Sequence, residues 1–158
     1  MFIEQNRESS QKKGWIEVIT GSMFSGKTEE LIRRINRVRI AGKEVKVFKP
    51  HIDNRYDADK IVSHNKTSLE SIKVKYAEEI LSWVEHTDVI SVDESQFFDD
   101  TLVDVCNDLA NMGKRVIVAG LDMDYKGNPF GPLPRIMAIA EYITKLQAIC
   151  MECGDLAH

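Results

Sequence analysis

Short apolar runs alternate along this chain with segments whose apolar residues recur at helical spacing. The runs are rich in β-branched residues and end at glycine, proline or an acidic residue, which is typical of buried strands. The predicted strands are 15–20, 44–50, 71–75, 88–94, 115–120 and 143–150. The predicted helices are 28–41, 76–86, 101–112 and 135–142. The polar stretch 51–68 has no clear period, and connections of this length are usually functional or mobile.

Strands that alternate with helices of about three turns indicate βαβ units, a parallel sheet and an α/β fold. In such sheets ligands bind beyond the carboxyl ends of the strands. The loops that start at 21, 94 and 121 all leave such ends. We therefore expect these three loops to converge on one site.

Composition narrows the class of protein. The chain has 158 residues, 43% of them hydrophobic and 29% charged, which fits one globular domain behind a loose polar arm at 1–14. A net charge of −4 argues against non-specific nucleic-acid binding, and no apolar run approaches the length of a membrane span. Three cysteines do not make a secreted disulfide framework. These features predict a cytoplasmic protein with neither nucleic acid nor membrane as its partner.

The segment GSMFSGKT (21–28) matches the phosphate-binding pattern G-x-x-x-x-G-K-[ST] between a predicted strand and a predicted helix. Its glycines let backbone N–H groups approach phosphate oxygens, Lys27 reaches the β- and γ-phosphates, and Thr28 can ligate Mg²⁺. The alternative is a chance glycine turn before a helix. The expected ATP-binding residues are Gly21, Ser22, Met23, Phe24, Ser25, Gly26, Lys27 and Thr28, joined by Asp93, Glu94, Ser95 and Gln96.

The segment VISVDE (89–94) is an apolar strand that runs into two acids, as a metal-binding Walker-B strand does. Asp93 is then the second Mg²⁺ ligand, and Glu94 can take a proton from an attacking hydroxyl or water. The alternative is a strand that simply ends in a solvated acid.

Three classes of nucleotide-binding protein remain: a small-molecule kinase, an ATPase motor or helicase that uses DESQ (93–96) as its motif II, and a regulatory switch. Helicases need two such domains and a basic track, whereas this chain has one domain and an acidic balance. Phe97, Phe98 and Tyr125 follow the predicted strand ends, where aromatic faces can stack on a nucleobase. Each of them taken alone is more often a core residue. The kinase interpretation uses more of these features.

Four segments, GSMFSGKT, DESQFF, AGLDMDYKGNPFG and LQAICMECG, together resemble the type II, cellular-type thymidine kinase family over about residues 15–155. The resemblance implies a P-loop NTPase-like (RecA-like) parallel sheet flanked by helices, within a kinase domain at 15–145. It also implies transfer of the γ-phosphate of ATP, with Mg²⁺, to the 5′-hydroxyl of thymidine, and also of deoxyuridine, in pyrimidine salvage for DNA synthesis. It further implies feedback inhibition by thymidine triphosphate and a homotetramer, with helix 28–41 supplying one interface.

The resemblance also assigns roles to residues. It places the catalytic base on Glu94, the metal-binding acid on Asp93, the base-stacking rings on Phe97 and Tyr125, and the pocket lining on Met23 and Leu121. Arg55 matches an arginine near the reacting phosphate, and the alternative for Arg55 is a solvated loop residue.

Cys150 and Cys153 form a C-x-x-C pair, which is half of a four-cysteine zinc site. A redox pair or two inert thiols are the alternatives. The resemblance implies that family members continue through a lasso-like loop with a second cysteine pair, so 146–158 would be the start of an incomplete zinc-knuckle and lasso subdomain. Cys106 is predicted to be a core thiol. The histidines show no metal-ligand spacing: His51, His64, His86 and His158.

Overall fold

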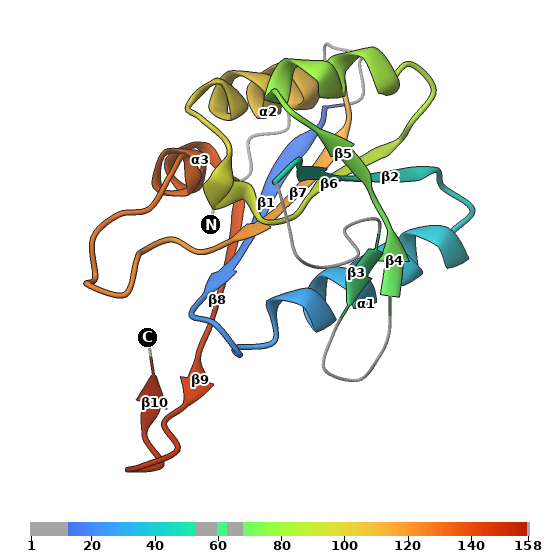
Figure 1. Ribbon diagram of the computed structural model, residues 1–158. Helices are drawn as coiled ribbons and strands as arrows, with labels where there is room; N and C mark the ends of the chain where they lie inside the picture. Colours follow the sequence, from blue (N-terminus) through green and yellow to red (C-terminus); the bar gives the residue numbers. More distant parts are fainter. Residues whose placement is uncertain (1–12, 53–59, 63–67, 158) are drawn as a thin grey trace, which may run out of the picture.

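The computed structural model of the protein describes residues 13–52, 60–62 and 68–157 (Figure 1). Its centre is a six-stranded parallel sheet in the order β5-β2-β6-β7-β1-β8. The strands are β1 (Trp15–Gly21), β2 (Val45–Pro50), β5 (Ile72–Val74), β6 (Val89–Val92), β7 (Arg115–Gly120) and β8 (Tyr142–Leu146). The predicted α/β fold with a parallel sheet is confirmed.

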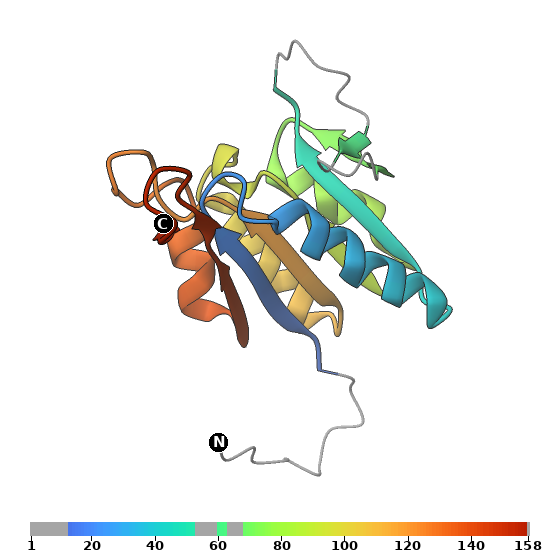
Figure 2. The same cartoon turned by 90° about the horizontal axis from the view of Figure 1, so that it is seen from below.

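Helices cover both faces of this sheet (Figure 2). One face carries α1 (Lys27–Ile40), whose buried Leu31, Ile32, Ile35 and Val38 pack against Ile19, Val47 and Ile117. The other face carries the 3₁₀ helix η1 (Ala77–Trp83), α2 (Thr101–Asn111) and α3 (Leu133–Ile139). Cys106 is fully buried in this second core, where burial raises the pKa of its thiol to about 12. The predicted core thiol is thus confirmed.

Three element boundaries differ from the prediction for physical reasons. Within the segment 76–86, where an α-helix was predicted, the structure has the 3₁₀ helix η1 over Ala77–Trp83. The sequence did not distinguish the two kinds of helix, because buried side chains at 77 and 80 share a face in both. α3 begins at Leu133, before the predicted start, because a helix tolerates proline in its first turn. The strand predicted at 143–150 divides: Leu146 pairs with Gly21, the last residue of β1, and the sheet offers no partner beyond it.

Two small antiparallel ribbons lie outside the main sheet. β3 (Lys60–Val62) pairs with β4 (Ser68–Glu70) within and beside the stretch expected to lack regular structure. Strands of three residues are too short to produce a recognisable alternation. β9 (Ala148–Ile149) pairs with β10 (Leu156–Ala157), and the C-x-x-C segment lies in the turn between them. No helix among the described residues is long and apolar enough to cross a bilayer.

Candidate active site

The phosphate-loop segment connects β1 to α1 at the carboxyl edge of the sheet, and its backbone requires its glycines. Gly26 has φ 92° and immediately precedes α1, where its carbonyl accepts the Glu30 N–H at 3.0 Å. Gly21 has φ 149°, and a Cβ there would lie 2.2 Å from the Leu146 carbonyl oxygen. L-residues with side chains rarely adopt either conformation. The glycine spacing therefore sets the loop geometry and is no chance turn.

Lys27, the first residue of α1, folds back over this loop. Its Nζ donates to the Ser22 carbonyl at 2.6 Å and lies 3.5 Å from the Ser25 Oγ. Burial lowers the pKa of Lys27, while the charges of Asp93, Asp122 and Glu29 counteract part of that lowering. A partly desolvated ammonium group at a helix N-terminus is suited to bind phosphate oxygens.

Asp93 follows β6 directly, and its N–H donates to the Phe48 carbonyl at 2.8 Å. Burial raises the pKa of Asp93 to about 6, and the neighbouring charge of Glu94 raises it as well. The ammonium groups of Lys27 and Lys49 act in the opposite direction. A carboxylate whose negative charge is disfavoured in this way fits the demands of a divalent cation, which would supply the missing positive charge.

Glu94 has a left-handed backbone, with φ 49° and ψ 40°, where it precedes the short 3₁₀ helix η2 (Ser95–Phe97). A left-handed conformation costs a residue with a side chain about 1–3 kcal/mol, and such residues cluster at functional sites. The surrounding structure must therefore hold this turn in place.

Three contacts with the end of β7 and the loop that follows it provide that support. The side-chain Oε1 of Gln96 accepts the N–H of Leu121 at 3.1 Å. A Cβ on Gly120 would lie 2.3 Å from the Ser95 Oγ, and a Cβ on Gly131 would lie 2.3 Å from the Gln96 carbonyl oxygen. Two glycines thus allow the acidic turn to pack directly against the segment 120–131.

The segment 121–131 is itself an ordered loop. Asp124 closes it: its N–H donates to the Asn128 carbonyl at 2.8 Å, and its Oδ1 accepts the N–H groups of Lys126 and Asn128 at 2.9 Å each. Tyr125, at the tip, is 92% exposed. A tyrosine held this far from the core by a closed loop is available to a ligand.

The two phenylalanines after the acidic pair separate in the structure. Phe97 is 53% exposed, and the ring of Phe130 packs edge-on against it with centroids 6.0 Å apart. Phe98 is 6% exposed and belongs to the core. Of the aromatic pair, Phe97 is the one that reaches the surface near the acidic turn.

The expected convergence of the three loops is therefore present. The electrostatic influence of Asp93 and Asp122 on Lys27, and the Gln96–Leu121 hydrogen bond, connect all three strand ends. Met23 is 63% exposed on the phosphate loop, and Leu121 is half-buried. Arg55 lies outside the described residues.

Three charged residues near this site were missed by the sequence reasoning. Asp122 forms an ion pair with Lys145 at 2.9 Å; burial raises its pKa, but Lys145 and Thr20 bring it below the usual value. Lys49 is buried near the end of β2. All three residues stand at or just beyond the carboxyl ends of strands, and that position was the available signal.

The C-x-x-C segment forms a tight turn in which the two cysteines are not joined by a disulfide. The Gly154 N–H donates to the Cys150 carbonyl at 2.9 Å. Backbone N–H groups of Cys153 and Glu152, together with the Cys153 side chain, lower the pKa of the Cys150 thiol. This environment favours a thiolate and so fits half of a zinc site. Among the described residues, no cluster of three or more candidate metal ligands occurs.

The family model for thymidine kinase matches residues 14–158. The chain belongs to the thymidine kinase family. It is 54% identical over 157 residues to a thymidine kinase of Bacteroides thetaiotaomicron, covering 99% of this chain and 79% of that one. It is 61% identical over 145 residues to a thymidine kinase of a Rhodothermus species, covering 92% and 68%. The resemblance that the four motifs carried is confirmed, and this family uses ATP with Mg²⁺.

A likeness to a solved structure supports the fold separately. The flagellar accessory protein FlaH of Methanocaldococcus jannaschii superposes with a TM-score of 0.60 at 16% identity, covering 92% of this chain and 76% of that one. At this identity the likeness concerns the fold alone, and it confirms the predicted P-loop NTPase-like architecture.

The raised pKa of Asp93 predicts how Asp93→Asn changes stability with pH in the metal-free protein. Between the usual pKa of 3.8 and about 6, the folded state retains a proton that the unfolded state has lost. The parent should therefore lose stability as the pH rises through this window, and the variant should not. Chemical denaturation from pH 4 to 8 should show the variant gaining on the parent up to about pH 6 and then staying level.

The same substitution at the exposed Asp108 controls for the loss of one charge. A stability difference between Asp93→Asn and the parent that does not change with pH would contradict the assignment.

Proposed function

We propose that the protein transfers the γ-phosphate of ATP to the 5′-hydroxyl of thymidine, with deoxyuridine as a second substrate. The observation that carries this proposal is the contact between the strained Glu94 turn and the aromatic loop at 121–131. It supports the proposal that a carboxylate for proton transfer acts next to a surface that binds the nucleobase, beside a phosphate loop. Thymidine kinase is also the activity that the family model and the named relatives carry.

In the proposed mechanism the phosphate loop and the N-terminus of α1 bind the triphosphate. Lys27 leaves the Ser22 carbonyl and donates to the β- and γ-phosphate oxygens, where its charge balances the charge that develops during transfer. Thr28 and Asp93 would hold Mg²⁺, which when bound neutralises phosphate charge and orients the γ-phosphate. The predicted role of Arg55 near the reacting phosphate stays a proposal.

Glu94 is proposed as the general base. Its carboxylate accepts the proton of the 5′-hydroxyl as the hydroxyl oxygen attacks the γ-phosphorus and ADP leaves. The Gln96–Leu121 hydrogen bond and the close packing of Ser95 against Gly120 support the left-handed turn that carries Glu94. A base at the end of a rigid turn needs little reorganisation during the reaction.

Thymine recognition is proposed to rest on Phe97 and Tyr125 for stacking, with Met23 and Leu121 lining the pocket. A neutral pyrimidine presents amide-like edges that backbone groups can bind, and a buried unpaired charge there would be costly. Purine nucleosides should then be excluded by the shape of the pocket.

Several further properties remain part of the proposal. They are a cytoplasmic location, feedback inhibition by thymidine triphosphate, and a homotetramer with one interface on the outer face of α1. The proposed organisation is an arm at 1–14, a kinase domain at 15–145 and the start of a zinc and lasso subdomain at 146–158.

Glu94→Gln should lower kcat by about 10²–10⁴-fold, the usual contribution of a general base. ATP affinity should change little, because the amide keeps the shape of the side chain and the phosphate loop is intact. Thymidine-dependent ADP release measures kcat, and nucleotide titration measures ATP affinity. Glu85→Gln, on an exposed segment away from the site, is the matched control. A Glu94→Gln enzyme with near-parental kcat would remove Glu94 from this role.

Tyr125→Ala should raise KM for thymidine by about tenfold, since stacking of a base on an aromatic ring contributes about 1–3 kcal/mol. KM for ATP should stay near the parental value. Tyr76→Ala removes another exposed tyrosine that precedes η1 and serves as the control. Equal effects of the two substitutions on thymidine KM would count against stacking at Tyr125.

The C-x-x-C turn predicts one structural zinc per subunit in a chain that supplies two further cysteines. Zinc that stabilises this turn should support folding and nucleoside binding more than chemistry. Elemental analysis should find stoichiometric zinc, and Cys150→Ser/Cys153→Ser should lose both the metal and thermal stability. Cys106→Ala should keep the metal. Absence of zinc, or parental stability and thymidine affinity in the double variant, would end the idea.

A further inference from the structure

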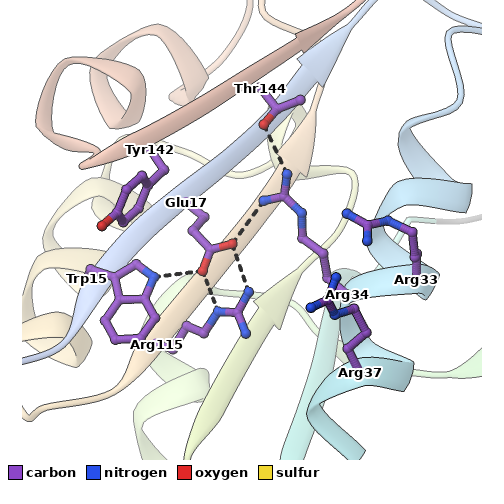
Figure 3. Close-up of a pocket in the computed structure, with 8 residues that line it drawn as sticks. All are labelled: Trp15, Glu17, Arg33, Arg34, Arg37, Arg115, Tyr142 and Thr144. Atoms are coloured by element: carbon purple, nitrogen blue, oxygen red, sulfur yellow. Dashed lines mark hydrogen bonds and ion pairs between the residues drawn. The ribbon is translucent and has the colours of Figure 1, made fainter.

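A pocket of about 560 Å³ opens on the α1 side of the sheet, at the amino-terminal end of the strands (Figure 3). Trp15, Arg115 and Tyr142 are the first residues of β1, β7 and β8. Because a strand rises about 3.3 Å per residue, the length of β1 separates Trp15 from the phosphate loop by about 20 Å. The pocket is therefore distinct from the candidate active site. Its lining residues are Trp15, Glu17, Arg33, Arg34, Arg37, Arg115, Tyr142 and Thr144.

The base of this pocket is a buried carboxylate, Glu17, which is 6% exposed. Its oxygens accept hydrogen bonds from the Trp15 Nε1 at 2.7 Å, from the Arg34 Nη1 at 2.9 Å and from Arg115 (Figure 3). Burial raises the pKa of Glu17, but these donors and the two guanidinium charges bring it below its usual value. Glu17 is thus a fixed negative charge that is already satisfied.

Two arginines are fully or mostly occupied by protein partners. Arg34 donates to Glu17, to Glu30 at 2.8 Å and to the Thr144 Oγ1 at 2.9 Å. Arg33 uses its Nε and Nη2 on Glu30. Because Glu17 and Glu30 are the carboxylates that pair with these arginines, the four guanidinium groups at the pocket leave a surplus of two positive charges.

Arg37 carries most of the unused hydrogen-bonding capacity. Its guanidinium points toward the pocket from the second half of α1, and within the described part of the chain it makes no side-chain hydrogen bond or ion pair (Figure 3). Arg33 and Arg115 each keep one Nη whose N–H groups donate to no described residue. Guanidinium groups in this state are suited to bind phosphate oxygens in pairs.

We propose that this arginine pocket is a second oxyanion site, which binds a phosphate monoester dianion through Arg37, Arg33 and Arg115. A group with about two negative charges matches the surplus positive charge. The volume lies within the range of small-molecule sites, about 300–1,000 Å³, so it accommodates an organic group beside the phosphate. Trp15 and Tyr142 also line this space.

Trp15 provides a direct readout, because the guanidinium of Arg115 stacks over its ring at 5.8 Å. The chain has two tryptophans, so Trp83→Phe leaves Trp15 as the single reporter. Titration of this variant with inorganic phosphate should change the Trp15 emission saturably. Titration with thymidine monophosphate then distinguishes the source of the phosphate: tighter binding identifies a nucleotide, and equal binding identifies the phosphate group alone.

Arg37→Gln, added to Trp83→Phe, should weaken this binding about tenfold or more, because it removes charge-assisted hydrogen bonds. Arg39→Gln, an exposed residue of the same helix outside the pocket, should leave it unchanged. The proposal is wrong if Trp15 does not respond to phosphate, or if both substitutions weaken the response equally. It is also wrong if light scattering shows that Arg37→Gln dissociates the protein while Arg39→Gln does not, since Arg37 would then belong to the proposed α1 interface between copies and not to a ligand site.

Discussion

The close approach of the Glu94 turn to the end of β7 determines where both halves of the candidate site lie. Side chains at 120 and 131 would clash with Ser95 and Gln96, so glycine at these positions is a condition for the contact. Gln96 then accepts the backbone N–H of Leu121, the first residue of the aromatic loop. The acidic turn and the aromatic loop are thus parts of one packed unit, and a displacement of either would move the other.

The charges at this edge of the sheet are arranged around burial. Asp93 is held where burial disfavours its negative charge, and Lys27 where burial disfavours its positive charge. Each partly compensates the other, but neither is fully satisfied by protein groups. In a medium of low dielectric constant such incomplete compensation costs free energy, which a bound Mg²⁺–triphosphate complex would recover. Incomplete compensation of this kind is expected at a ligand site and is uncommon in a structural ion pair.

The sequence predicted the parts of this structure that follow from periodicity and from backbone requirements. The apolar run at Val89–Val92 and the glycines at 21 and 26 reflect local backbone requirements, so the fold class and the phosphate loop could be predicted from them. The sequence pattern could not tell which of Phe97 and Phe98 is exposed and which is buried. That assignment depends on the backbone turn at Glu94, which the pattern does not reveal. Asp122 and Lys145 pair across two strands, and sequence spacing carries no such information.

The position of Lys27 depends on how α1 is fixed against β1. Its apolar face is buried against the sheet, but an apolar contact alone permits the helix to slide along its axis. Arg34 opposes this movement, since it joins Glu30 of the same helix to Glu17 of β1 and Thr144 of β8 with hydrogen bonds of defined direction. Gly26 then sets the point at which the helix begins. The guanidinium–carboxylate network at the base of the arginine pocket therefore also fixes the position of α1, and with it the position of Lys27 at the phosphate loop.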